Sequence, residues 1–342
     1  MLRRFSCVAV PAVLLAVCLA AAPVQPQDQP AVDPLPSWND GPSKKALVEF
    51  VKATTDKASP RFVPVAERIA TFDNDGTLWV EQPLYTQVVF ALDRVKALAP
   101  KHADWETKEP FKSVLAGNRE AMAKFTKQDL LQIMAATHAG MSVPEFQAIA
   151  KDWLATAKHP RFKRLYTECV YQPMLEVMRY LRASGFKTYI VSGGGQEFMR
   201  TFADRVYGVP VEQVIGSAIK LKYGYHDGRP VMMRQAALLL LDDEDGKPED
   251  IELFIGRKPL AAFGNSDGDR EMLEYTGSGD GARLMMLVLH DDAQREYAYG
   301  PARGLPDTKM GTFSPALDAE AKKNGWTVIS MKSDWKRIFA FD

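Results

Sequence analysis

The chain has 342 residues, of which 46% are hydrophobic and 25% charged, and its 43 basic side chains equal its 43 acidic ones. These values are typical of a globular protein with a large buried core. They exclude pervasive disorder and a very small domain that depends on disulfides or metals for stability. Because the net charge is close to zero, a polyanion-binding surface is not indicated, and nucleic acid is not an expected partner.

The first 22 residues resemble a secretory signal peptide. Arg3 and Arg4 give a positive start, an apolar run covers 8–19, and alanines at 20–22 offer small residues for cleavage. This run is shorter than the ~20 apolar residues that span a bilayer, so a cleaved leader is favoured over a membrane anchor. We therefore predict a periplasmic or secreted protein. Cys169 would be its one remaining cysteine, which excludes an internal disulfide.

Residues 23–43 are rich in Pro, Gln and Asp, a composition that buries too little apolar area to offset the entropy of ordering. They are predicted to form a flexible tether. Ordered structure is expected from residue 44, where apolar side chains recur at helical spacing at Ala46, Leu47, Phe50 and Val51.

The rest of the chain predicts an α/β core over 44–78 and 173–342. Short apolar segments alternate with helical patterns, which is typical of a Rossmann-like parallel sheet; the segments are 68–72, 187–191, 260–263 and 284–289. Residues 79–172 have a helical pattern almost throughout and are predicted to form an inserted helical cap. Alternating residues over 221–232 suggest a hairpin off the sheet, and 326–331 could add a further strand.

Three polar residues lie at or shortly after the carboxyl ends of three of these strands: Asp73, Ser192 and Asp267. Ligands of parallel α/β sheets normally bind beyond the carboxyl ends of the strands. Asp73 and Asp75 can converge on one small site only if the chain bends after the strand, and Gly76 permits such a bend. One carboxylate could then attack while its neighbour handles protons. The alternative is an ordinary turn that uses Asp and Gly for turn chemistry.

Hydroxyl and backbone donors lie near the same strand ends. Ser192 offers a hydroxyl, and Gly193 with Gly194 would let backbone N–H groups approach an anion at a helix N-terminus. Thr77 could donate in the same way. The acidic cluster 265–269 could hold a metal, or it could be a solvated turn that caps the following helix.

These motifs, taken in order, resemble those of the haloacid dehalogenase superfamily, specifically its phosphoserine phosphatase-like phosphatase branch. The match consists of the Asp73–Thr77 stretch, Ser192 with its glycines, a lysine before the third strand and the acidic cluster. The resemblance implies an Mg²⁺-dependent phosphomonoesterase that acts on small phosphate esters through an aspartyl-phosphate intermediate. Asp73 would be the nucleophile, and Asp75 would protonate the leaving alkoxide and later activate water.

The resemblance also implies how Mg²⁺ is held: by Asp73, by the backbone carbonyl of Asp75 and by an oxygen of the acidic cluster. Asn265 stands where the family usually has an aspartate, and an amide oxygen can ligate but brings no charge. Asp267 therefore ranks first as the third ligand, with Asn265 and Asp269 next.

A lysine of the family screens the nucleophile from the phosphate, and here it has two candidates. Lys247 precedes Pro248 at the start of a predicted helix and is favoured; Lys258 adjoins the third strand. Trp79 and Glu81 follow the nucleophile loop, where a lid would begin, and are candidates for substrate recognition. The alternative for Trp79 is packing at the domain junction.

Two other functions stay open. A metal-independent dehalogenase of the same superfamily would need neither Asp75 nor the acidic cluster, so both argue against it. An exported, non-catalytic or weakly active protein that binds phosphate esters would explain Asn265 as the mark of a decayed metal site. In each phosphate-based hypothesis the expected partner is a small phosphorylated molecule. The protein itself is expected to have no stable membrane span.

Overall fold

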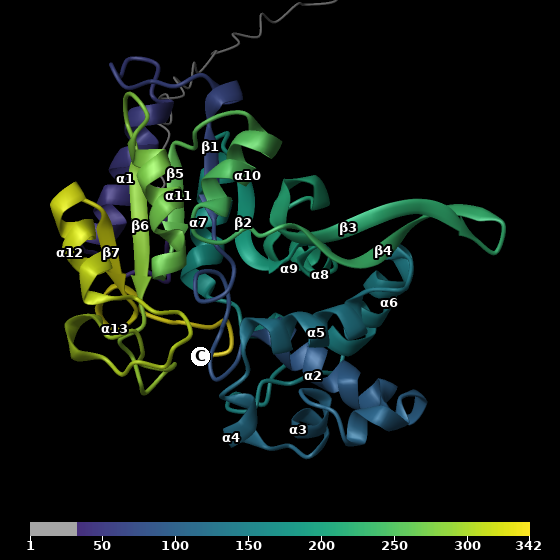
Figure 1. Cartoon of the computed structure of the whole chain (residues 1–342). Helices are drawn as coiled ribbons and strands as arrows, with labels where there is room; N and C mark the ends of the chain where they lie inside the picture. Colours follow the sequence, from purple (N-terminus) through teal and green to yellow (C-terminus); the bar gives the residue numbers. More distant parts are fainter. Residues whose placement is uncertain (1–32) are drawn as a thin grey trace, which may run out of the picture. The chain divides into compact units, whose positions relative to one another are not determined.

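The computed structural model describes residues 33–342 (Figure 1). The predicted leader and residues 23–32 of the predicted tether lie outside the described residues. Within the described range, none of the helices has both the length and the apolar character needed to cross a bilayer. Cys169, also within this range, is buried and forms no disulfide.

A seven-stranded sheet in the order β4-β3-β2-β1-β5-β6-β7 forms the centre of the fold. All neighbouring strands are parallel except β3 and β4, which are antiparallel. The strands are β1 (Ile69–Phe72), β2 (Lys187–Gly195), β3 (Val214–His226), β4 (Arg229–Leu240), β5 (Ala261–Gly264), β6 (Leu284–Leu289) and β7 (Thr327–Ser330). The predicted parallel α/β fold is confirmed, and the C-terminal strand β7 forms one edge of the sheet.

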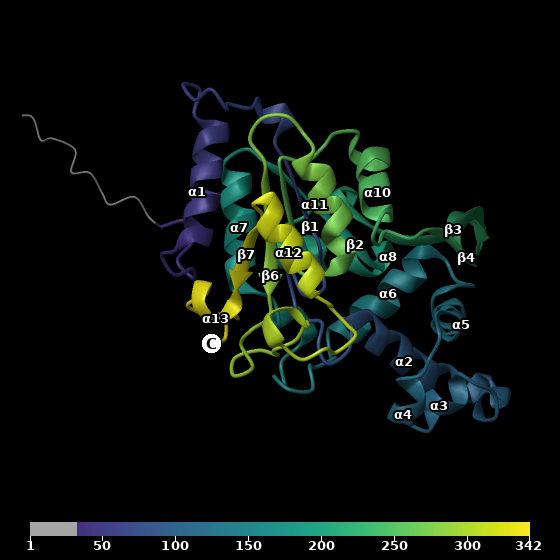
Figure 2. The same ribbon diagram turned by 60° about the vertical axis from the view of Figure 1, so that its left-hand side comes forward.

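Helices cover both faces of the sheet (Figure 2). On one face lie α1 (Pro42–Thr55) and α7 (Gln172–Ala183); on the other lie α10 (Gly246–Ile255), α11 (Arg270–Gly277) and α12 (Pro315–Asn324). Successive strand residues alternate between the two cores, so Phe263 packs with α1 and α7 while Ala262 packs with α11 and α12. Because both faces are covered, the strands read as continuous apolar runs.

The segment between β1 and β2 is helical. It contains α2 (Thr86–Leu98), α3 (Phe111–Leu115), α4 (Arg119–Met122), α5 (Lys127–His138) and α6 (Val143–Leu154). Val95, Trp105 and Ile133 belong to a small core within this segment. Helices α5 and α6 begin with capping boxes at Thr126 and Ser142, in which the cap side chain and the third helical residue bond reciprocally.

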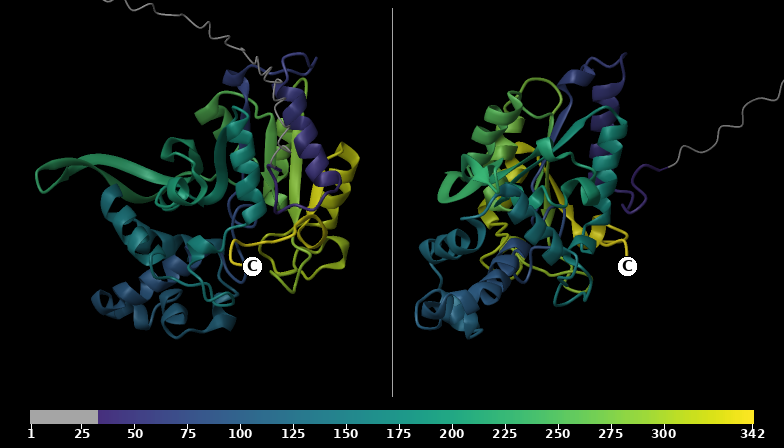
Figure 3. Two further views of the ribbon diagram at one scale, coloured as in Figure 1. Left: turned by 180° about the vertical axis from the view of Figure 1, so that it is seen from behind. Right: turned by 90° about the vertical axis from the view of Figure 1, so that its right-hand side faces the viewer.

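The hairpin β3–β4 projects from the sheet edge (Figures 1 and 3). Its turn residues Asp227 and Gly228 both have positive φ, as a tight two-residue hairpin requires. Strand β4 is joined to the helical segment by two backbone hydrogen bonds: Gly140 N–H donates to the Arg234 carbonyl, and Arg234 N–H donates to the Met141 carbonyl, each at 2.9 Å. The hairpin and α5 are therefore held together.

The predicted flexible tether ends earlier than residue 43. Leu35 and Trp38 are fully buried, and the indole Nε1 of Trp38 donates to the carbonyl of Pro173 at 3.1 Å. The Trp38 ring also packs edge-on against Trp335, with 6.0 Å between ring centroids. Two large apolar anchors outweigh the polar composition around them, which is why the composition of the segment was misleading.

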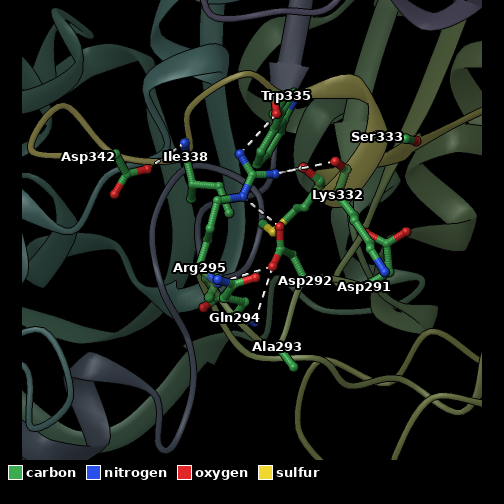
Figure 4. Close-up of polar contacts among 12 residues, drawn as sticks. Asp291, Asp292, Ala293, Gln294, Arg295, Lys332, Ser333, Trp335, Ile338 and Asp342 are labelled. Carbon is green, nitrogen blue, oxygen red and sulfur yellow. Dashed lines mark hydrogen bonds and ion pairs between the residues drawn. The ribbon is translucent and has the colours of Figure 1, made fainter.

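Arg295 fixes the loop after β6 to the C-terminal segment (Figure 4). Its guanidinium donates to Asp292 Oδ2 at 2.6 Å, to the Trp335 carbonyl at 3.0 Å and to the Met331 carbonyl at 2.7 Å. The same loop continues into Glu296, which contacts His290 beneath the nucleophile loop described below. The C-terminal segment thereby supports the region where the site is built.

Candidate active site

The loop after β1 brings two aspartates to one cavity. Asp73 and Asp75 both line a cavity of about 600 Å³ at the carboxyl ends of the strands. The turn that follows them passes through Gly76, whose φ is +76°. A Cβ at this position would overlap the amide nitrogen of Asn265 and the carboxylate of Glu81, so both the conformation and the space require glycine. The bend that the sequence predicts is present.

Lys247, in the first turn of α10, bridges two carboxylates. Its Nζ donates to Asp73 Oδ1 at 2.8 Å and to Asp269 Oδ1 at 2.5 Å, and all three side chains are buried. The other oxygen of Asp269 accepts from the backbone N–H groups of Asn265 and Ser266. Asp269 therefore orients Lys247, and both of its oxygens are engaged in hydrogen bonds within the protein.

Burial dominates the electrostatics of the two aspartates. It raises the pKa of Asp73 from 3.8 to about 7, although Lys247 opposes the shift. Burial likewise raises the pKa of Asp75 to about 6, opposed by the hydrogen bond at 2.8 Å from the indole Nε1 of Trp79 to Asp75 Oδ1. Burial lowers the pKa of Lys247, but the neighbouring Asp269 and Asp73 outweigh it, so this pKa is raised and the ammonium keeps its charge.

The Ser192 loop also lines the cavity, but most of its backbone donors are taken. Ser192 N–H donates to Asp242 Oδ2 at 2.8 Å, Gly194 N–H donates to the Ser192 hydroxyl at 3.3 Å, and Gly195 N–H donates to Gln87 Oε1 at 2.6 Å. Ser192 and Gly193 face the cavity as predicted. The Gly194 N–H was expected to face an anion, but in the structure it donates to the Ser192 hydroxyl within the loop.

Three further predicted residues form a buried polar chain behind the aspartates. Thr77 donates through its hydroxyl to Asn265 Oδ1 at 3.0 Å, and Asn265 Nδ2 donates to Glu81 Oε1 at 2.7 Å. Glu81 also accepts from the hydroxyl of Tyr299 at 2.8 Å. These bonds fix which end of the Asn265 amide faces which neighbour. Thr77 and Glu81 thus hold Asn265. Glu81 also lines the cavity, so the substrate contact predicted for these residues stays a prediction.

Trp79 is buried at the junction between the loop and the fold. Its ring stacks on Phe202 with 4.6 Å between ring centroids, while its Nε1 donates to Asp75. Its position therefore favours a structural and electrostatic role over the substrate recognition predicted from the sequence.

Two predicted residues lie elsewhere. Lys258 is exposed, and its Nζ donates to Ser278 Oγ at 2.8 Å, so the structure separates it from the cavity. Asp267 does not line the cavity; its Oδ1 accepts from the backbone N–H of Ser314 at the start of α12. The ranking that places Asp267 first among the metal ligands is corrected by this bond, because the carboxylate stabilises a helix start instead.

The donor set fits a hard divalent cation. Within residues 33–342, no group of three His, Cys, Asp or Glu side chains is arranged to hold a metal. The oxygens that could hold such a cation are a carboxylate of Asp73, the backbone carbonyl of Asp75 and the amide oxygen of Asn265, which also accepts from the Thr77 hydroxyl. These are donor types that Mg²⁺ accepts. Several buried carboxylates share the single ammonium of Lys247, and this excess of negative charge favours a bound cation.

Sequence reasoning missed four residues that shape the site. Asp242 is buried with its pKa raised to about 8, chiefly by burial, and holds the Ser192 loop. Tyr207 donates to Asn74 Oδ1 at 2.9 Å, and His290 Nε2 donates to the Gly76 carbonyl at 2.8 Å. Gln87 of α2 binds the glycine loop. Only Asp242 carried a signal, since it follows an apolar strand as the predicted site residues do.

The comparisons place the chain in a known family. The family model of haloacid dehalogenase-like hydrolases matches residues 70–274, which is more than half of the chain. The chain therefore belongs to this family, and the predicted resemblance is confirmed. No curated protein matches the chain.

Several solved structures resemble it. A functionally unknown protein from Anaerococcus prevotii has a TM-score of 0.53 at 14% identity, covering 84% of this chain and 91% of that one. A protein of unknown function from Bordetella pertussis has a TM-score of 0.46 at 18% identity, with coverage of 77% and 98%. Phosphoserine phosphatase from T. onnurineus has a TM-score of 0.31 at 18% identity, with coverage of 68% and 88%. The first of these supports the fold.

Proposed function

We propose that this hydrolase is an exported, Mg²⁺-dependent phosphomonoesterase. The observation that carries the proposal is the pair of aspartates on one cavity, the buried Asp73 and the half-buried Asp75, with Lys247 bonded to Asp73. A carboxylate nucleophile beside a second carboxylate of raised pKa supplies both a covalent step and proton transfer. Membership of a hydrolase family agrees with this chemistry.

In the first step, Asp73 attacks phosphorus. Lys247 holds Asp73 Oδ1, so the other carboxylate oxygen forms the bond to phosphorus while the bond from phosphorus to the ester oxygen breaks. The leaving alkoxide takes a proton from Asp75, whose pKa of about 6 keeps the proton available near neutral pH. The products are an alcohol and an aspartyl-phosphate at residue 73.

In the second step, Asp75 is ionised and takes a proton from water. The oxygen of that water attacks phosphorus, the bond to Asp73 breaks, and inorganic phosphate leaves. A bound Mg²⁺, held by Asp73, the Asp75 carbonyl and Asn265, would neutralise phosphate charge during both steps. Glu81 and Thr77 keep the amide oxygen of Asn265 in place.

The proposal is tested by release of p-nitrophenol from p-nitrophenyl phosphate, in Mg²⁺ and in EDTA. The wild-type protein and Asp267→Asn are expected to turn over only with Mg²⁺, while Asp73→Asn loses at least about 10³-fold in kcat. Asp267 is the matched control because it is an aspartate near the same strand ends that does not line the cavity.

Two outcomes contradict the proposal. No Mg²⁺-dependent turnover across a broad set of phosphate monoesters, with binding of those esters retained, supports the non-catalytic alternative. Metal-independent release of halide from a haloacid supports a dehalogenase instead.

Export rests on the leader-like sequence, with its arginines at positions 3 and 4 and its apolar run. Expression in a Gram-negative host is expected to deliver the protein to the periplasm with the first 22 residues removed, as read by N-terminal sequencing. A protein that stays in the cytoplasm with its full N-terminus contradicts export and leaves the catalytic proposal intact.

A further inference from the structure

The cavity that contains Asp73 extends well beyond the catalytic cluster. From Asp73, Asp75 and Lys247 it continues between helices α2 and α5 and the hairpin β3–β4. Its volume of about 600 Å³ is in the range that holds a molecule much larger than phosphate. The space away from the aspartates therefore has to accommodate the alcohol part of a substrate.

The walls of that outer space are mainly apolar. Side chains that line it include Leu92, Leu130, Ile133, Ile219, Leu221 and Leu238. They come from three separate elements, yet they face one space because the backbone hydrogen bonds at Arg234 join the hairpin to the end of α5. Ile219 and Leu238 are direct cross-strand partners on one face of the hairpin.

Several of these leucines are incompletely covered by the protein. Leu130, Leu131, Leu221 and Leu238 keep 40–48% of their surface exposed although they line the cavity. Leaving such side chains in water forgoes about 25 cal/mol for each Å² that could be buried. An apolar group placed in the cavity would recover part of this free energy.

The charged groups of the outer wall have partners within the protein. Arg200 and Glu197 form an ion pair at 2.7 Å. Arg234 Nε donates to the His138 carbonyl at 2.7 Å, and its guanidinium lies 3.9 Å from the centroid of the Phe146 ring. Burial lowers the pKa of His138 to about 3, so this imidazole is neutral. The charges of these groups are thus met within the protein, and apolar side chains make up most of the outer wall.

We propose that the substrate is a phosphate monoester of an apolar alcohol, whose hydrocarbon part lies between α5 and the β3–β4 hairpin. This inference rests on the proposed phosphomonoesterase function and names its substrate class. The phosphate binds at Asp73 and Lys247, and the chain of the alcohol covers the leucines of α5 and of the hairpin.

The test compares kcat/KM for n-alkyl phosphates from butyl to octyl, kept below the concentrations at which they form micelles. We expect kcat/KM to rise with chain length, by up to about fourfold for each added methylene. Glycerol phosphate, of similar size to the butyl ester but polar, is expected to be a poorer substrate than butyl phosphate.

Leu238 and Leu239 provide a matched pair of variants. They are neighbours on β4 with similar exposure, 44% and 56%, but of the two only Leu238 lines the catalytic cavity. Leu238→Gln is expected to lower the octyl-to-butyl ratio of kcat/KM several-fold. Leu239→Gln is expected to keep the wild-type ratio.

A wild-type kcat/KM that does not change with chain length overturns the inference, as does an equal loss of the ratio in both variants. In either case, retained Mg²⁺-dependent hydrolysis of p-nitrophenyl phosphate shows that the phosphomonoesterase proposal stands. Comparing kcat/KM for hexadecyl phosphate in phosphatidylcholine vesicles with that for octyl phosphate in solution shows whether the substrate is a membrane lipid or a soluble ester.

Discussion

Replacing Asp73 by Asn should abolish turnover and at the same time stabilise the metal-free fold at alkaline pH. Asp73 is buried, and burial raises its pKa from 3.8 to about 7 despite the ammonium of Lys247. In the native protein its ionised form is therefore less favourable than in the unfolded chain, where the carboxyl is solvated. Asparagine resembles the neutral carboxyl in shape and cannot ionise.

The pKa difference sets the size of the effect. At 1.36 kcal/mol for each pKa unit, the change from 3.8 to about 7 corresponds to about 4 kcal/mol of lost stability. A carboxyl whose folded-state pKa is raised gives stability that is present below pH 3.8 and is lost as pH rises to about 7. The stability advantage of Asp73→Asn should therefore grow by about 3 kcal/mol between roughly pH 4.5 and pH 8.

Urea unfolding in EDTA at these two pH values measures the difference. Asp267→Asn is the control, because its half-buried carboxylate bonds to Ser314 N–H and an amide oxygen can accept the same bond. Its stability relative to wild type is expected to change little with pH. A difference between Asp73→Asn and wild type that stays constant with pH, or reverses in sign at pH 8, would refute the reasoning.

Two further predictions concern the groups that hold the aspartates. Lys247→Met leaves Asp73 and Asp269 buried without their cation. Urea unfolding at neutral pH should therefore show a free energy of unfolding lower by about 3–5 kcal/mol, and phosphate release should be lost. An unchanged free energy of unfolding would contradict the buried bridge. Trp79→Phe keeps the stacking on Phe202 but removes the donor to Asp75, so the pKa of Asp75 should rise above about 6 and the half-maximal pH of kcat should move upward. An unmoved pH profile would show that this hydrogen bond does not tune Asp75.

The sequence was sufficient for the fold and for the residues at the strand ends. Apolar runs of four to six residues, spaced by helical patterns, predicted the parallel sheet because strands buried on both faces have no polar alternation. Asp73, Ser192 and Asn265 directly follow β1, the core of β2 and β5, so their position along the chain fixed their position in space. These patterns are local, so they can be recognised in a single sequence.

The interactions between distant segments could not be predicted in this way. The sequence favours Lys247 over Lys258 but leaves both as candidates, and the packing of α10 against the sheet separates them. Asp267 and Asp269 differ by two positions, yet one binds the backbone N–H of Ser314, the cap residue of α12, and the other orients Lys247. Leu35 lies in a polar segment, and its burial depends on partners in the folded core.

The proposed mechanism requires a covalent bond between Asp73 and phosphorus. Asp75→Asn, which lacks the base for the second step, is mixed with excess p-nitrophenyl phosphate and Mg²⁺, quenched in acid and digested for mass spectrometry. We expect one phosphoryl group on the peptide that contains Asp73. This group should be absent when Asp73 is also replaced by Asn. Release of p-nitrophenol by wild-type protein, with no phosphoryl group on that peptide in any quenched sample, would contradict the proposed mechanism.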